Sequence, residues 1–219
     1  MSSISPFFSR SGIVALVLLA VLAAPAFGTP INAFVFPQPS SATDTVTGND
    51  AFYFTPLRNI IVSALGMYDH NQDGLTQTHT VGLYQVSGTV LLQSITVGPG
   101  GGFINGVFRF ETIPDTLLSA GTQYAVSGFT VTATGSHAWN PPGLAIAPLI
   151  GYNGYAYNLN GAPSLPTGPL DPSGTFFGPS FLFSENPEPA TLLLAGTGLL
   201  LLGLCRGRVW AGRAVSTPR

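Results

Sequence analysis

The sequence predicts an all-β protein, an antiparallel β-sandwich of the jelly-roll or immunoglobulin-like type, with an N-terminal signal helix before it and a short C-terminal transmembrane helix after it. Three observations predict this class. The middle of the chain consists of short runs rich in β-branched and aromatic residues, separated by turn-forming Gly, Pro, Asn and Asp clusters. Each end holds a compact apolar run next to arginine. Only 7% of the 219 residues are charged, against roughly 25% in soluble globular proteins.

Residues 1–28 are predicted to be a signal peptide. Arg10 precedes the apolar run GIVALVLLAVLAAPA, which ends in small residues, as secretory signals do. Ala24 and Ala26 suit the small-residue positions before a cleaved bond, and a cut after Gly28 also fits. A buried amphipathic helix would instead show a polar face, and this run has none.

The β-rich middle is predicted to begin with a linker or first-strand region over residues 29–48 and to continue as the sandwich over residues 49–185. Six runs carry the strand pattern: NDAFYFT, NIIVSALGMYD, HTVGLYQV, GTVLLQSITV, GVFRFETI and TQYAVSGFTVT. The Ser87-Gly88 pair between two of them predicts a tight hairpin turn. Outside the two ends of the chain no ten-residue stretch shows helical periodicity.

The composition changes over residues 136–185, which are rich in Gly, Pro, Asn and aromatic residues. This pattern predicts long loops that decorate the sandwich, followed by a last strand at FFGPSFLFS. The stretch also contains an aromatic group made of Trp139, Tyr152, Tyr155 and Tyr157. Aromatic rings with one apolar and one wet side suit either the grip of a sugar ring or the cover of a core, and both alternatives stay open.

Residues 186–219 form the last predicted segment. It contains a motif of Pro187, Glu188 and Pro189, an apolar helix over residues 190–205 and a basic tail over residues 206–219. The fifteen residues from Ala190 to Leu204 reach only about 22 Å as a helix at about 1.5 Å each, which is short of the roughly 30 Å hydrocarbon core. The span is therefore expected to be a marginal and temporary one. Proline before it gives a sharp start and an extended, accessible peptide.

The arginines at both ends predict one topology. Arg10 precedes the first apolar run, and Arg206, Arg208 and Arg213 follow the second. Basic residues that flank membrane segments stay in the cytoplasm. Residues 29–186 are therefore expected outside the cell.

The Pro-Glu-Pro motif, the apolar run ATLLLAGTGLLLLGL and the arginines after it resemble the PEP-CTERM sorting signal of Gram-negative bacteria. The resemblance implies that the chain is a substrate of exosortase, a membrane enzyme that processes such tails during export. A simple tail anchor is the alternative. A lipid-anchor signal of the GPI type is disfavoured, because fifteen residues with four arginines follow Leu204.

A second resemblance covers roughly residues 50–135. The stretches IIVSALGMYDHNQDGLTQTHTVGLYQVSGTVL and LLSAGTQYAVSGF are similar to a β-sandwich domain of unknown function found in exported bacterial surface proteins. The resemblance implies a fold and no activity.

The loop between two predicted strands contains a candidate metal site. Asp69, Asn71, Asp73 and Gly74 spell D-x-N-x-D-G, the opening of a calcium-binding loop. Thr80 stands where such a loop would supply a bidentate glutamate, and neither flank is helical. A polar turn without a metal is the alternative, because turns prefer the same residues.

No pattern typical of an enzyme accompanies these features. The sequence lacks G-x-S-x-G, P-loop and H-E-x-x-H motifs. His70, His79 and His137 are widely spaced and are expected on loops or strand surfaces. Residues 29–186 hold two arginines and eight acidic residues, a formal charge of −6, so nucleic acid is not an expected partner.

Together these patterns predict a non-enzymatic, exported protein of the cell surface or extracellular matrix, associated with exopolysaccharide or biofilm. It would pass through a membrane-tethered intermediate before it reaches the surface or is secreted. The alternative is a carbohydrate-binding module for exopolysaccharide that uses the tyrosine and tryptophan side chains, with or without calcium. Otherwise no cofactor is expected.

Overall fold

The computed structural model describes residues 28–37, 47–131, 137–139, 141–173 and 176–186. They belong to one compact unit, Gly28–Asn186. The predicted signal helix, sorting motif, transmembrane helix and basic tail lie outside the described residues. Within the described part, no helix is long and apolar enough to cross a membrane.

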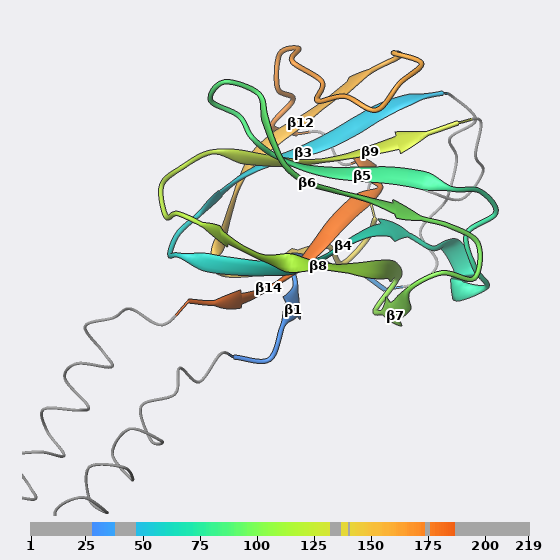
Figure 1. The fold of residues 1–219 in the computed structure, drawn as a ribbon, viewed down its shortest axis with the longest axis horizontal. Coiled ribbons are helices and arrows are strands. Elements are labelled where there is room, and N and C mark those ends of the chain that lie inside the picture. Colours follow the sequence, from blue (N-terminus) through green and yellow to red (C-terminus); the bar gives the residue numbers. More distant parts are fainter. Residues whose placement is uncertain (1–27, 38–46, 132–136, 140, 174–175, 187–219) are drawn as a thin grey trace, which may run out of the picture. The chain divides into compact units, whose positions relative to one another are not determined.

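Two five-stranded antiparallel sheets make up the unit (Figure 1). The first sheet has the order β1 (Ile31–Asn32), β14 (Pro179–Glu185), β4 (Ile60–Tyr68), β8 (Phe108–Leu118) and β7 (Phe103–Asn105). The second has the order β12 (Ile150–Asn158), β3 (Gly48–Pro56), β9 (Tyr124–Thr130), β5 (His79–Gln85) and β6 (Val90–Val97). The prediction of an all-β, antiparallel protein is confirmed for the described residues.

Two pairs of short strands and one 3-10 turn complete the described part of the unit. They are the pair β10 (Ala138–Trp139) and β13 (Phe176–Phe177), the pair β2 (Phe34–Val35) and β11 (Ala145–Ile146), and a single 3-10 turn over His70–Gln72. Asn32 of β1 donates a hydrogen bond of 3.0 Å to the Oδ1 atom of Asn105 in β7. Because these strands are the two edges of the first sheet, that sheet must curve strongly.

Aromatic side chains fill the space between the two sheets. Phe54 of β3 stacks on Phe181 of β14 with ring centroids 4.6 Å apart. Phe34 reaches the same core from the N-terminal segment and lies 3.9 Å from Phe52. All four rings are almost fully buried, and rings of this size dominate the energetics of a core. The unit therefore contains its own core and can be produced without the chain ends.

The predicted hairpin at Ser87-Gly88 is confirmed between β5 and β6. Gly88 and Thr89 both adopt positive φ angles, 78° and 53°. The amide of Thr89 donates to the carbonyl of Val86 over 3.0 Å. Glycine makes this left-handed geometry accessible at one of the two positions.

The prediction of loops up to the last strand is wrong chiefly at β12, and the two-residue strands β10 and β11 also fall in that stretch. Residues 150–158 form β12, a nine-residue strand that pairs with β3 at the edge of the second sheet. A register shift between Tyr152 and Gly154 interrupts the pairing, and Gly154 has a φ angle of 126°. A β-bulge of this kind disturbs the period-2 alternation by which strands are detected in sequence.

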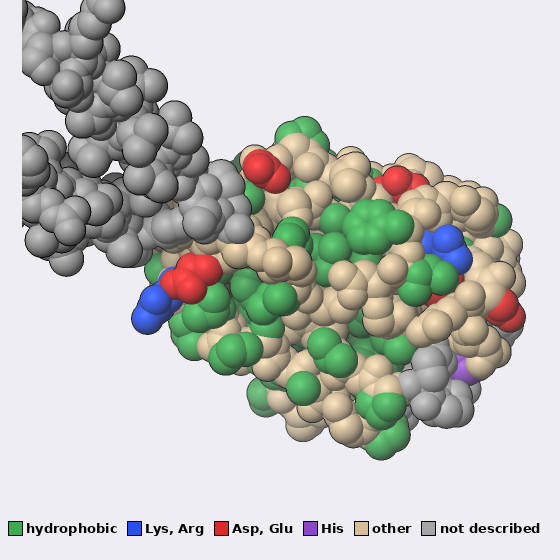
Figure 2. Space-filling model, turned by 90° about the horizontal axis from the view of Figure 1, so that it is seen from below, with side chains coloured by type: hydrophobic (Ala, Val, Ile, Leu, Met, Phe, Trp, Pro, Cys, Tyr) green, Lys and Arg blue, Asp and Glu red, His purple; other side chains and the backbone are tan. Residues whose placement is uncertain are grey.

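On the face seen in Figure 2, hydrophobic side chains are scattered among polar ones and charged side chains are few. This agrees with the low charge of the sequence. The solvated surface on this side therefore depends on neutral polar groups and backbone.

Candidate functional site

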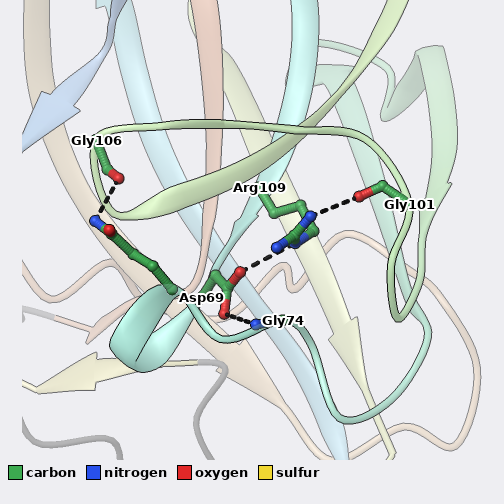
Figure 3. Close-up of polar contacts among 6 residues, drawn as sticks. Asp69, Gly74, Gly101, Gly106 and Arg109 are labelled. Carbon is green, nitrogen blue, oxygen red and sulfur yellow. Dashed lines mark hydrogen bonds and ion pairs between the residues drawn. The ribbon is translucent and has the colours of Figure 1, made fainter.

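The candidate calcium loop begins where β4 ends, and its first acidic residue is already paired (Figure 3). The Nε atom of Arg109 donates to the Oδ2 atom of Asp69 over 3.0 Å. The amide of Gly74 donates to the Oδ1 atom over 3.2 Å. The side chain of Asp69 is 1% exposed and that of Arg109 is 12% exposed. Both carboxylate oxygens of Asp69 thus accept hydrogen bonds from other residues of the protein.

The rest of the loop is arranged around this ion pair. Arg109 also donates to the carbonyl of Gly101 over 3.0 Å, and Gln72 donates to the carbonyl of Gly106 over 2.8 Å. Asn71 adopts a left-handed φ of 63° and is exposed, as is Asp73. These bonds tie the loop to the β7–β8 hairpin and to the turn before it.

The geometry therefore gives Asp69, the first of the residues predicted for calcium, a structural role. The guanidinium of Arg109 supplies the positive charge that a cation would bring to Asp69. Among the described residues, no group of three or more His, Cys, Asp and Glu side chains is arranged to hold a metal ion. A calcium ion at Asp69 would compete with the guanidinium of Arg109 for the carboxylate.

Two histidines meet inside the unit, although the sequence places them 58 positions apart. The Nε2 atom of His137 lies 2.5 Å from the Oδ2 atom of Asp50. His79 shares a hydrogen bond of 3.4 Å with the hydroxyl of Thr130. Both histidines are 1% exposed. Burial, and secondarily the proximity of His137, lowers the pKa of His79 from 6.5 to about 4.

The expectation of a loop or strand-surface position is wrong for His79, which is buried in β5, whereas His137 lies outside the strands, as a loop residue would, but is buried. A signal for His79 was present in the sequence: His79, Val81 and Leu83 alternate along β5, and all three are buried. Such alternation places residues on one face of a strand. No comparable signal marks His137, which precedes the two-residue strand β10.

The structure divides the predicted aromatic group. Tyr152 packs against the main core and stacks on Phe52 with centroids 4.9 Å apart, and burial raises its pKa to about 12. Tyr155 and Tyr157 form a separate pair, with centroids 6.4 Å apart and planes only 16° from parallel. Trp139 belongs to β10, and its side chain lies outside the described part. Tyr155 and Tyr157 are thus brought together, and Tyr152 is not part of their pair.

The tyrosine pair belongs to an open groove beside β12. The groove encloses about 480 Å³, and its lining includes Tyr155, Tyr157, Asn158, Leu159, Pro169 and Asp171. Tyr157 is 60% exposed. The main chains of Tyr155 and Asp171 exchange two hydrogen bonds of 3.0 and 2.9 Å. These bonds fix the carboxylate-bearing segment against the strand.

The far wall of the groove comes from the segment between β12 and β13, which is anchored to the second sheet. Asn49 of β3 donates to the carbonyl of Ala162 over 3.0 Å and accepts from the amide of Ser164 over 2.9 Å. The hydroxyl of Tyr53 donates to the carbonyl of Pro166. Leu165 packs with Tyr53 in a small second core. Hydrogen bonds and one apolar contact therefore hold this segment against the second sheet.

The groove carries acidic character. The Asp171 carboxylate accepts bonds from the amide and the hydroxyl of Ser173, at 2.9 and 2.7 Å. Burial first, and Asp171 second, raise the pKa of Tyr155. The two arginines among the described residues are paired elsewhere, Arg58 with Glu185 and Arg109 with Asp69, and neither lines the groove.

Comparisons with known proteins add no assignment. No model of a known protein family matches this chain, and no curated protein gives a significant match. The residues Pro187, Glu188 and Pro189 of the predicted sorting motif lie outside the described part, as do Arg10, Arg206, Arg208 and Arg213.

Proposed function

We propose that this chain is an exported, non-enzymatic protein of the cell surface or extracellular matrix, sorted through its Pro187-Glu188-Pro189 motif by an exosortase-like membrane enzyme. The order of segments along the chain supports the proposal: an apolar run after Arg10, a β-rich unit of negative charge, and the motif followed by a short apolar run and arginines. This order matches the topology that basic flanks impose.

Mass spectrometry of the protein from its native host tests the sorting step. A mature C-terminus within residues 187–190 is expected, because the proline-flanked peptide is extended and accessible to a processing enzyme. Mature protein that retains the sequence through Arg219 contradicts processing. A reporter fused at residue 150 tests export separately, and a cytosolic reporter overturns it.

We further propose that the sandwich is of the jelly-roll type rather than the immunoglobulin-like type. The supporting observation is the strand order. If the eight strands β1, β3, β4, β5, β6, β8, β9 and β14 are numbered along the chain, the sheets have the orders 1-8-3-6 and 2-7-4-5. This arrangement belongs to the eight-stranded jelly roll, whereas an immunoglobulin sheet combines strands 1, 2, 5 and 4. β7 and β12 extend the two sheets at their edges.

The groove favours a second candidate function, a carbohydrate-binding module for exopolysaccharide. One observation carries it: Tyr155 and Tyr157 present two nearly parallel rings in an open groove, and Tyr157 is 60% exposed. Amphipathic rings suit ligands that combine apolar faces with hydroxyl groups. The jelly roll also occurs among lectin domains, which is support by analogy of fold only.

Binding of polysaccharides to the Gly28–Asn186 unit tests this second function. Tyr155→Ala and Tyr157→Ala are expected to abolish binding, because each removes one ring of the pair. Phe103→Ala is the matched control, since Phe103 is a half-exposed ring on β7 in the other sheet. A calcium-assisted form of the proposal would use Asp69, Asn71 and Asp73, and repeating the titration with a chelator tests it. Absence of binding to every saccharide overturns the second function.

A further inference from the structure

The charge around the tyrosine pair restricts which saccharides the groove can accept. Asp171 contributes a carboxylate to the lining, and neither of the two described arginines lies there. The surrounding unit has a formal charge of −6 over residues 29–186. A field of this sign concentrates cations and repels anions near the surface.

The tyrosine rings also favour a cationic ligand over an anionic one. The faces of tyrosine rings attract cations, such as an ammonium group that lies within about 6 Å of a ring centroid. Tyr155 and Tyr157 are 6.4 Å apart, so one ligand can contact both rings. Asp171 is joined to Tyr155 through the main chain, which keeps the carboxylate beside the same rings.

We infer that the groove binds saccharides that carry protonated amino groups, glucosamine-type units, in preference to neutral or acidic sugars. This inference rests on the carbohydrate-binding function proposed above and names its ligand class. The sugar ring packs on the tyrosines, and its ammonium group faces Asp171. Uronic acids and sulfated sugars are disfavoured, because their charge meets the carboxylate of Asp171, and neither arginine of the described residues lies in the groove.

Calorimetric titration of the Gly28–Asn186 unit with three probes tests the inference: oligosaccharides of glucosamine, the same oligosaccharides after N-acetylation, and oligomers of a uronic acid. The glucosamine form should bind roughly tenfold more tightly than its N-acetylated form, as one cation–π or ionic contact predicts. Its binding should weaken with added salt. The uronic acid should not bind.

The outcomes test two claims separately: that the groove binds carbohydrate, and that it prefers amino sugars. If none of the probes binds, the preference for amino sugars is overturned, and the carbohydrate function fails with it when neutral glucose oligosaccharides do not bind either. If the N-acetylated or acidic probe binds as tightly as the glucosamine probe, sugar binding stands and the preference for amino sugars is overturned.

Two variants test whether sugar binding and the preference for the amine both depend on the groove. Asp171→Asn keeps the main-chain bridge and an oxygen for Ser173, so it should remove the preference for the amine while it retains the weaker binding. Asp115→Asn is the matched control, because it removes an exposed carboxylate from β8 in the other sheet. Tyr157→Ala should lose all binding, and its exposed position leaves the fold intact. An Asp171→Asn variant that still discriminates overturns the assignment.

Discussion

The Asp69 loop and the tyrosine groove both satisfy simple rules for a ligand site in sequence, yet their surroundings differ. At Asp69 both carboxylate oxygens accept bonds from the protein, one from Arg109 and one from Gly74. At the groove the ring of Tyr157 is largely exposed and the lining is open. The first region uses the carboxylate of Asp69 to hold a turn, whereas the second exposes the ring of Tyr157 in an open groove. A polar motif is therefore weak evidence for a ligand when its first carboxylate is buried and accepts bonds from the protein on both oxygens.

The largest expected effect comes from breaking the Asp69 pair. Arg109→Ala leaves a carboxylate that is 1% exposed without its cation, and such losses cost roughly 3–5 kcal/mol. Urea unfolding measures the change. Arg58→Ala is the matched control, because Arg58 pairs with Glu185 on the surface, with side chains 65% and 45% exposed. The Arg58→Ala change should lower the free energy of unfolding by no more than roughly 1 kcal/mol. Equal effects for the two variants would show that the Asp69 pair is not structural.

A second effect should appear with acid. The folded protein holds His79 neutral down to about pH 4, whereas the unfolded chain takes up the proton near pH 6.5. The contribution of His79 to the free energy of unfolding is therefore fully present above about pH 6.5. It falls by roughly a few kcal/mol between pH 6.5 and 4 and does not change further below pH 4. Denaturant unfolding across this range measures it.

His79→Asn provides the control for that acid effect. The variant removes the titrating ring and retains Asp50, His137 and Thr130. The difference between the two stability curves should slope only between about pH 4 and pH 6.5. Parallel curves for the two proteins over this range would contradict the burial of a neutral His79.

The smallest effect concerns calcium. Because Arg109 occupies Asp69, millimolar calcium should leave the melting temperature of the native unit unchanged, whereas in Arg109→Ala it should raise that temperature. Thermal melting with calcium or chelator measures both. A calcium-dependent rise in the native unit would mean that the loop is a metal site after all, with Asn71 and Asp73 as further ligands.

The sequence was informative where local pattern decides structure. Strands such as β5 and β9, and the hairpin at Gly88, follow from alternation and turn chemistry. β12 was missed because its bulge at Gly154 breaks the alternation. The meeting of His79, His137 and Asp50 depends on long-range packing, which no local pattern records. For the same reason the sequence could group Tyr152 with Tyr155 and Tyr157 but could not assign them to a core and a groove.

The difference between the two regions is tested most directly by a backbone-amide NMR titration of the Gly28–Asn186 unit with glucosamine oligosaccharides. The expected result is a set of saturable shifts over residues 155–159 and 168–171, with residues 69–74 unmoved. Shifts centred on residues 69–74, or none in the groove at saturating sugar, would contradict the proposal that the tyrosine groove is the ligand site and the Asp69 loop a structural element.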